Sequence, residues 1–340
     1  MDVVIFQEDN IPQYLIDNTR KDRRKLSMYF NRRVIDTVIL EPFDFEPSGD
    51  WYLFEEHVMN DTFVYWLTDS LVYKRESLTM LATYQVTDSL LNYIPFHDTL
   101  KFNFREPSKK AVRRRRQQEE LEKVEKMSIS VDIKGGQEHD LYRPLTFEIQ
   151  HPVSMVDTSR ISLVRLEDSL EIPVPYSLVH DNVKLRRYFL KVDWEGLATY
   201  KLDVFPHAFT DIYGLTHDTM SVKIRVRDPE YYSRILLNLT GVRGQKIIQV
   251  LDNKGNSVRQ KLTSSDGLVE FDYMPPSSFT LKLIHDRNGN GKWDTGDYLE
   301  HSQPEAVEFR PGEIKIRSNF DMEINWELEV PKEPDTTDVD

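Results

Sequence analysis

The sequence contains no cysteine, and that absence excludes several kinds of chemistry. The chain can form no disulfide, offers no thiol nucleophile and cannot bind zinc or an iron–sulfur cluster through sulfur. It also lacks a run of about 20 apolar residues, the length that a helix needs to cross a bilayer. Its first residues, Met1-Asp2-Val3-Val4, have neither the charged nor the apolar region of a secretion signal. We therefore expect the chain as given to be soluble, with no membrane span.

Recognisable catalytic motifs are missing too. The sequence has no Gly-x-Ser-x-Gly nucleophile elbow, no His-Glu-x-x-His pair, no phosphate-binding loop and no dinucleotide fingerprint. The tightest cluster of acid and histidine is Glu55-Glu56-His57. Successive residues of a strand face opposite sides, so this cluster favours a solvated strand end over an acid–base pair. We predict that the protein is not an enzyme.

The composition is that of a globular protein with more than one core. A chain of 340 residues exceeds what one hydrophobic core usually organises, and its 39% hydrophobic content is enough to build two or three. Its 44 basic residues against 57 acidic ones give a net charge of −13, which repels phosphate backbones. Nucleic acid is therefore not an expected partner.

Most of the chain shows a β pattern. Short runs rich in Val, Ile, Thr, Tyr and Phe alternate with clusters of Asp, Asn, Gly, Ser and Pro, as in Thr62–Leu67. In the run Ser221–Arg227, polar and apolar residues alternate strictly, so one face of that strand is expected to be buried. Turns about every ten residues are typical of β-sandwiches. We predict an all-β fold.

One segment departs from this pattern. Ser108–Lys126 is highly charged, begins with a basic half that contains Arg113–Arg116, and has only four apolar residues. It could be a basic patch for an acidic partner, or a solvated connector whose basic and acidic halves partly neutralise each other. We favour the connector, since a polar charged tract between two β regions is typical of an interdomain linker.

The flanks of this tract contain an internal repeat. His97-Asp98-Thr99 and His217-Asp218-Thr219 lie 120 residues apart, and each leads into an alternating strand. A preceding strand-like run accompanies each triplet, Ser77–Tyr84 in one copy and Thr199–Phe205 in the other. Such self-similarity indicates two copies of one sandwich. We interpret the triplets as structural, with Asp and Thr closing a turn through bonds to the backbone, and not as catalytic.

These patterns divide the chain into five parts arranged as a rod. Two similar sandwiches are expected at 1–107 and 128–227, joined by the charged linker at 108–127. A third sandwich is expected at 228–330, because the pattern changes after Pro229, and it should be a meander of about seven short strands. The acidic, proline-bearing residues 331–340 should form a frayed tail.

The strongest local signal is an Asp/Asn-rich loop after the strand that ends at Ile284. Oxygen-bearing side chains occupy loop positions 1, 3, 5, 9 and 12 of an EF-hand-like pattern, with Gly at position 6 and the carbonyl of Lys292 at position 7. This spacing predicts Ca²⁺ as a bound ion. The loop follows a strand instead of a helix and ends on Asp instead of Glu, so a surface turn without metal remains the alternative. The expected side-chain ligands are Asp286, Asn288, Asn290, Asp294 and Asp297.

Several of these segments together resemble a known family. The segments are Phe6–Asp9, Gln13–Leu15, Phe30-Asn31, Asp50–Tyr52, Asp61–Ser70, Asp88–Leu90 and, most specifically, Asp286–Tyr298. With them the chain resembles the Ig-like domain-containing exported proteins and lipoproteins of Bacteroidetes. The resemblance implies two bacterial Ig-like domains followed by a prealbumin-like or carboxypeptidase-regulatory-like β-sandwich. It also implies a place in the periplasm, outer membrane or cell surface, with an amino-terminal lipoprotein anchor that this chain lacks.

The resemblance implies a structural or interaction module, possessing no activity of its own, that contacts other envelope proteins as a monomer. The alternative is a glycan-binding or enzyme-accessory module, in which Trp51, Trp66 and Trp194 would line up on one exposed face. Seven Asp-Ser or Asp-Thr triplets resemble the O-glycosylation sequon of exported Bacteroidetes proteins, but such pairs also start turns. They begin at Asp36, Asp69, Asp88, Asp98, Asp168, Asp218 and Asp335.

Overall fold

The computed structural model describes most of the chain, with gaps. The described residues are 12–105, 125–296 and 303–328, without Ser48, Val58, Leu91, Ser169 and residues 134–137. Most of the predicted linker, including Arg113–Arg116, the whole predicted tail and Asp297 lie outside the described residues. Nearly every element in the described part is a strand; the exceptions are one short helix, α1 (Ser70–Tyr73), and two 3₁₀ turns, Thr158–Arg160 and Pro229–Tyr231. The predicted all-β fold class is confirmed.

The first sandwich packs two antiparallel sheets around a core that runs from Leu26 to Phe102. Alternation creates this core: in one strand Leu26, Met28 and Phe30 point inward, while Lys25, Ser27 and Tyr29 are on the other face. One sheet has the order β1 (Leu15–Asp22), β2 (Lys25–Phe30), β5 (Thr62–Leu67), β4 (Tyr52–Glu55). The other has the order β3 (Ile39–Pro42), β6 (Ser77–Thr87), β7 (Tyr93–Asn103).

The second sandwich has its own core, between Met127 and Val226. One sheet has the order β12 (Leu170–Pro173), β11 (Ile161–Glu167), β15 (Thr199–Val204), β17 (Met220–Arg225). The facing sheet has the order β13 (Ser177–His180), β14 (Arg187–Lys191), β9 (Leu145–Ile149), β8 (Ile129–Val131). A two-stranded sheet at one end pairs β10 (Val153–Val156) with β16 (Phe209–Asp211).

The third sandwich, whose core lies between Ile235 and Leu328, has eight described strands and is not the predicted meander. One sheet has the order β21 (Gly267–Met274), β18 (Ser233–Thr240), β25 (Met322–Glu327), and β18 pairs with β25 in parallel. The other joins β20 (Ser257–Thr263), β19 (Lys246–Leu251), β22 (Ser278–His285) and β23 (Val307–Phe309), with β24 (Ile314–Lys315) also on β22. The meander prediction is wrong because some strands that follow one another, such as β18 and β19 or β20 and β21, lie in different sheets, and the two sheets bury their apolar faces against each other.

The repeated triplets lie where the repeat predicts, at the last strands of the first two sandwiches. His97 lies within β7, which pairs with β6, and His217 precedes β17, which pairs with β15. The predicted turn-closing role is wrong. Asp98 accepts a hydrogen bond from the Tyr84 hydroxyl at 3.3 Å, and Asp218 pairs with Lys126 at 2.5 Å.

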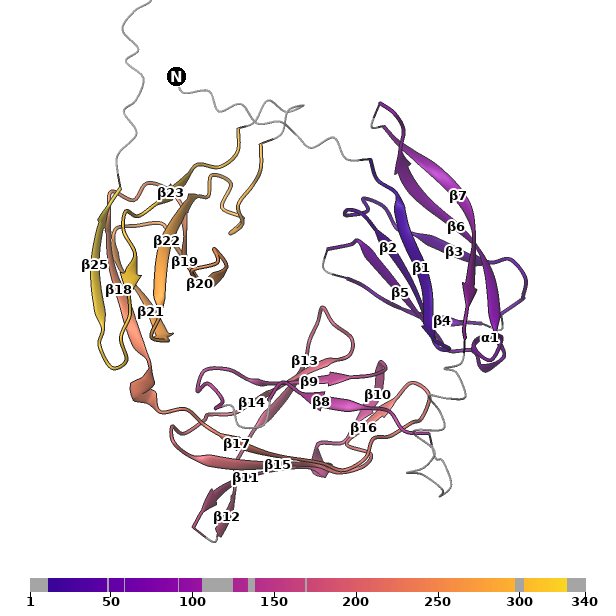
Figure 1. Cartoon of the computed structure of the whole chain (residues 1–340), viewed down its shortest axis with the longest axis horizontal. Helices are drawn as coiled ribbons and strands as arrows, with labels where there is room; N and C mark the ends of the chain where they lie inside the picture. The colour runs from indigo at the N-terminus through magenta and orange to yellow at the C-terminus, as the bar shows by residue number, and fades with distance from the viewer. Residues whose placement is uncertain are drawn as a thin grey trace, which may run out of the picture.

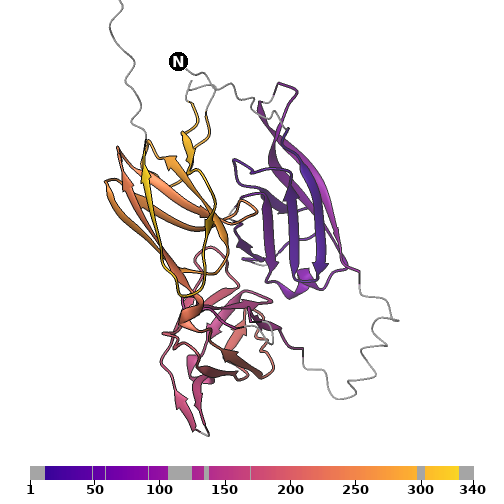
Figure 2. The ribbon, with the colours of Figure 1, turned by 60° about the vertical axis from the view of Figure 1, so that its left-hand side comes forward.

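The three sandwiches do not line up as a rod. In Figure 1 the second sandwich forms the base of an open arc, with the first and third rising from its two ends. Figure 2, turned by 60°, again shows the first and third sandwiches on the same side of the second. The two junctions at the base therefore decide the shape of the chain.

Candidate functional site

The Asp/Asn-rich loop is organised around the carboxylate of Asp286, which follows β22 and is 3% exposed. Its Oδ1 accepts the backbone N–H groups of Gly289 (2.8 Å) and Asn290 (3.2 Å). Its Oδ2 accepts the N–H of Gly291 and the side-chain amide of Gln245, both at 2.8 Å. Burial raises the pKa of Asp286, but these four donors lower it by more, so the carboxyl group is ionised. By accepting the N–H groups of Gly289, Asn290 and Gly291, the carboxylate holds the loop in a tight turn.

Three other predicted ligands converge in the same loop. The carboxamides of Asn288 and Asn290 both donate from Nδ2 to Oδ2 of Asp294, at 2.5 and 2.7 Å. The carboxamide oxygens of these asparagines accept the N–H groups of Asn290 (3.1 Å) and Lys292 (2.7 Å). Gly289 and Gly291 have φ values of +74° and +75°, in the left-handed region that favours glycine, which permits this tight winding.

Glu305 closes the loop and was not predicted. It is 4% exposed, and its two carboxylate oxygens accept the N–H groups of Arg287 (2.7 Å) and Asp294 (3.2 Å). Its own backbone bonds to Asp294, and its carbonyl accepts the indole N–H of Trp293 at 3.1 Å. Because Glu305 lies outside the spacing of the motif, no sequence signal singles it out.

The donor set of this loop fits a hard cation only in part. Asp286, Asn288, Asn290 and Asp294 supply oxygens, and each carboxamide oxygen accepts one N–H and keeps a second lone pair. Lys292 is exposed, as expected if only its carbonyl is a ligand. Within the described residues, however, no group of three or more acidic, His or Cys side chains gathers around a point.

His151 is the centre of the junction between the first and second sandwiches. It is 1% exposed, and its Nδ1 lies 2.6 Å from Oδ2 of Asp211 within the second sandwich. Its Nε2 lies 3.9 Å from Oδ2 of Asp22, at the end of β1 in the first sandwich. The imidazole packs edge-on against Trp66 and Tyr213, with centroids 5.7 and 5.3 Å away. One buried ring therefore joins carboxylates of two sandwiches.

A second ion pair crosses the same junction. Glu55, at the end of β4, accepts the indole N–H of Trp66 at 2.6 Å and the guanidinium Nε of Arg186 at 3.1 Å. Glu55 is 7% exposed, so the prediction of a solvated strand end is wrong: the second sandwich covers it. The neighbouring His57 pairs instead with Asp61, at 3.1 Å. Nothing in the local sequence indicates that Glu55 is covered, because its cation is 131 residues away.

Arg24 completes this junction. Its guanidinium lies over the ring of Tyr213, 4.6 Å from the centroid, and bonds to both carboxylate oxygens of Glu125 at 2.5 and 2.9 Å. Glu125 is the first residue of the predicted linker that the structure describes. The chain is thus attached to the first sandwich just before it enters the second.

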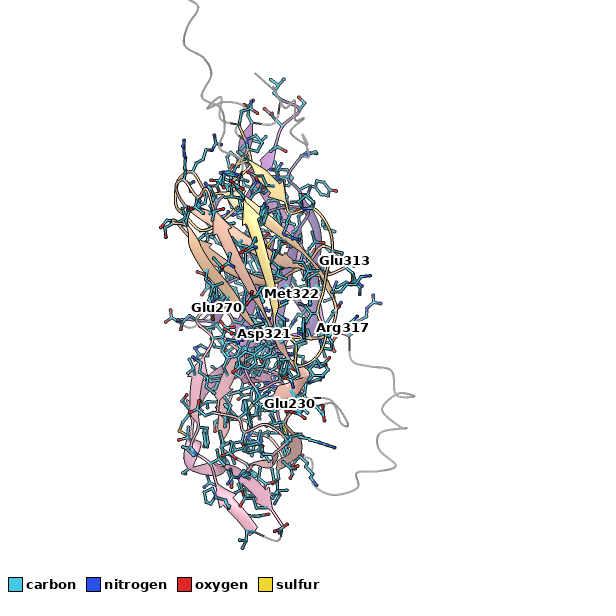
Figure 3. All side chains as sticks on the ribbon, turned by 90° about the vertical axis from the view of Figure 1, so that its left-hand side faces the viewer. Glu230, Glu270, Glu313, Arg317, Asp321 and Met322 are labelled. Carbon is cyan, nitrogen blue, oxygen red and sulfur yellow. The ribbon has the colours of Figure 1, made fainter. Side chains whose placement is uncertain are left out.

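The junction between the second and third sandwiches is aromatic. Tyr142 stacks on Tyr273, with centroids 5.2 Å apart, and the guanidinium of Arg259 lies over the ring of Tyr142, 4.5 Å from its centroid. The hydroxyl of Tyr232 donates to Asp140, across the junction. Figure 3 shows Glu230 at this junction, with Asp321 and Met322 just beyond it.

Gly196 is required at this second junction. A Cβ at this position would lie 2.3 Å from Cδ of Pro229, whose ring cannot move aside without moving the chain between the sandwiches. Only glycine permits so close an approach.

The alternative glycan platform is not formed by the predicted residues. Trp51, Trp66 and Trp194 are 7%, 2% and 7% exposed, so none of them offers a face to a sugar. Two of the Asp-Ser pairs start turns, as the alternative interpretation expected: Asp69 accepts the N–H of Leu71, and Asp88 accepts the N–H groups of Leu90 and Asn92.

The comparisons with known proteins show remote similarity alone. No family model matches the sequence, and no curated protein matches it. Solved structures that are similar include the TIE protein of Bacillus anthracis, at 10% identity and a TM-score of 0.19, covering 96% of this chain and 58% of that one. Dimeric latent PorU from Porphyromonas gingivalis is 10% identical with a TM-score of 0.25, covering 92% of this chain and 32% of that one. The N-terminal four Ig domains of Dscam1 are 6% identical with a TM-score of 0.19, covering 94% of this chain and 79% of that one.

The chain thus spans less than two thirds of the TIE protein and of PorU. At these identities and TM-scores the similarities do not bear on function. The class of the protein, a chain of tandem all-β sandwiches, follows from its strand order and its three cores.

The first prediction concerns the pH dependence of the first junction. Burial lowers the pKa of His151, but its contacts with Asp211 and Asp22 raise it by more, to a net value above 6.5. The same contact lowers the pKa of Asp22 below 3.8. The imidazolium therefore stabilises the folded state fully below pH 6.5, and this contribution is lost as the pH rises through the raised pKa. Asp22 adds its contribution above pH 3.8 and loses it as the pH falls further.

We expect His151→Asn to lower the free energy of unfolding of the sandwiches that meet at the first junction by about 3 kcal/mol near pH 6. The reason is that it leaves Asp211 buried without its cation. The difference from the wild type should narrow towards pH 9. Urea unfolding at several pH values measures it. His180→Asn, at an exposed histidine of the same sandwich, serves as the control. A difference for His151→Asn that stays constant with pH would contradict the ionic role.

Proposed function

We propose that this chain is a non-enzymatic structural module of a bacterial cell-envelope lipoprotein, which holds three sandwiches at fixed angles and presents their faces to other envelope proteins. The observation that carries the proposal is the construction of the two junctions. Each combines charged groups with aromatic rings from both sandwiches, as in the contacts of His151, Arg186 and Arg259. A flexible string of domains would not need buried charges at its joints.

The resemblance to exported Bacteroidetes proteins supports the place in the envelope. Among the described residues, no helix is both long and apolar enough to cross a membrane. In our proposal, a lipid anchor or a partner protein attaches the chain to the envelope. The surface expected for a partner is polar, since the net charge is −13.

Calcium is the second part of the proposal. The convergence of Asn288, Asn290 and Asp294 beside Asp286 supports an ion in this loop. The side chains would supply carboxylate and amide oxygens, and Lys292 its carbonyl. The ion would offset the repulsion between the carboxylates and would stiffen the end of the third sandwich; its role is structural.

Rigid junctions can be tested by spin labelling, which is specific here because the natural chain has no cysteine. Labels at Lys101→Cys and Lys191→Cys, both exposed, report the first junction, and labels at Lys191→Cys and Lys261→Cys report the second. We expect narrow distance distributions by pulsed electron resonance. Arg186→Gln should broaden the first distribution and leave the second unchanged, because it leaves the buried Glu55 without its cation.

The control is Arg225→Gln, which removes an exposed cation of the same sandwich that pairs with Glu138. Broad distributions in the unaltered chain would contradict the proposal of a fixed scaffold.

The envelope location is tested by fractionating cells that make the natural protein. We expect it in the periplasmic or outer-membrane fraction, bound to other proteins after brief cross-linking. Recovery in the cytoplasmic fraction would contradict this part of the proposal.

The calcium prediction is tested by melting the full chain with millimolar calcium and then with chelator. Calcium that binds the folded state alone raises stability by roughly 2.7 kcal/mol at a hundredfold excess over Kd. Asp286→Ala should erase this increment, whereas Lys292→Ala should preserve it.

Because Asp286 also turns the chain in the absence of metal, its loss lowers stability with or without calcium, and only the increment is diagnostic. Asp252→Ala is the matched control. Asp252 accepts the N–H groups of Lys254 and Asn256 in a similar turn of the same sandwich. Asp252→Ala should lower the stability of the sandwich but leave the calcium-dependent increment in stability unchanged. Equal melting midpoints with calcium and with chelator in the unaltered chain would mean that the loop is a turn that binds no calcium.

A further inference from the structure

A cavity of about 650 Å³ opens at the end of the third sandwich that lies away from the second. Three segments form its walls: the turn before β19, the start of the Asp/Asn-rich loop, and the chain from Pro304 to Glu308. Its volume falls within the range of small-molecule sites in proteins.

The cavity is lined by a lysine that is almost completely buried. Lys246, the first residue of β19, is 5% exposed. It shares a face of the strand with the core residues Ile248 and Val250, so its side chain enters the open end of the core. Its Nζ donates to the carbonyl of Arg243. Among the described residues, no carboxylate forms an ion pair with this ammonium, which has two further N–H groups to donate.

A buried ammonium without an anion is costly. Burial lowers the pKa of Lys246, with Glu308 opposing that shift. A bound anion would offset the cost of burying the charge, in the way that a carboxylate side chain does in a buried ion pair.

The other charges of the cavity leave positive charge in excess. Arg243 and Arg287 join Lys246 as cations of the lining, opposite the carboxylates of Glu308 and Asp286. Both carboxylates are engaged: Glu308 with His285, and Asp286 with its four N–H donors. Among the described residues of the lining, cations therefore outnumber anions by one, in a chain whose net charge is −13.

The walls also limit the kind of anion. Pro304 and Ala306 give the cavity an apolar side. The side chains of Pro304 and Ala306 offer no hydrogen-bond donor, so this side favours an anion with an apolar body over one that is polar all round, such as phosphate. We propose that this cavity binds a small organic carboxylate, whose charged end lies at Lys246 and Arg243 and whose apolar body lies against Pro304 and Ala306.

This site does not depend on the calcium proposal, although Asp286 contributes to both. Lys246 and Arg243 belong to the turn before β19 and not to the Asp/Asn-rich loop. Each binding measurement below is therefore made with calcium and again with chelator. Binding in both conditions supports the carboxylate site whether or not the loop holds an ion.

The experiment is calorimetric titration of the full chain with hexanoate, acetate and inorganic phosphate. Each methylene buried in the cavity should strengthen binding roughly threefold to fourfold. We expect hexanoate to bind at least tenfold more tightly than acetate, and phosphate to bind most weakly. Binding of phosphate as tight as that of hexanoate, or no heat with hexanoate, would overturn the proposal.

Two variants locate the site. Lys246→Met keeps the apolar stem and removes the charge, and should weaken hexanoate binding at least tenfold. Arg243→Gln keeps the backbone carbonyl that Lys246 contacts and should weaken binding less. The control is Lys315→Met, at a lysine that is 78% exposed in the same sandwich, which should bind as the unaltered chain does.

If Lys246→Met fails to fold, Arg243→Gln still tests the site, together with the amide resonances of Gln245 and Ala306. Hexanoate should shift these resonances in the unaltered chain. Unchanged affinity in Arg243→Gln combined with unshifted resonances would overturn the proposal, as would a folded Lys246→Met that binds with full affinity.

Discussion

The burial of Trp66 between the first two sandwiches is the constraint on which the shape of this chain depends. In β5, Phe63, Tyr65 and Leu67 point into the first core, so Trp66 lies on the opposite face, which a lone sandwich would expose to water. It is nevertheless 2% exposed, because Arg186 and His151 of the second sandwich cover it. Burying a large indole contributes a few kcal/mol, but only if the polar groups buried with it are paired. Glu55 meets that condition by bonding to Trp66 and Arg186 together.

The sequence predicts the layers of this protein well, because each layer is decided by local alternation. The run Thr62–Leu67 is β5 with the same bounds, and the predicted strand Ser221–Arg227 contains most of β17, Met220–Arg225. The repeat also places the last paired strands of the first two sandwiches correctly. Sheet order is harder to predict. The parallel pairing of β18 with β25 joins segments 87 residues apart, and local pattern does not indicate which strand will lie beside another.

In the candidate sites, too, features that depend on local sequence are predictable and features that depend on long-range contacts are not. The spacing of Asn288, Asn290 and Asp294 is a local property, and the structure brings these three side chains together. Glu305 and Lys246 are not local in this sense. Glu305 is recognisable only by the backbone donors that it meets after the chain returns to the loop. Lys246 looks like an ordinary charged residue at the start of a strand until the sandwich closes around it. Glu55 was misjudged for the same reason, since a carboxylate at a strand end is usually solvated unless another domain covers it.

Both junctions place arginine over aromatic rings, and this choice follows from what a joint between domains must do. Arg24 lies over Tyr213, Arg186 over Trp66 and Arg259 over Tyr142, with centroid distances of 4.6, 5.4 and 4.5 Å. A planar guanidinium stacks on a ring and still donates in its own plane, whereas a lysine ammonium offers a point charge on a flexible stem. Arg24 uses both properties at once, since it also bonds to the two oxygens of Glu125. An arginine can therefore fix distance and orientation across a joint in one contact. In the scaffold that we propose, cations of this kind would hold the sandwiches at set angles without the large apolar interface that a permanently fused pair of domains would need.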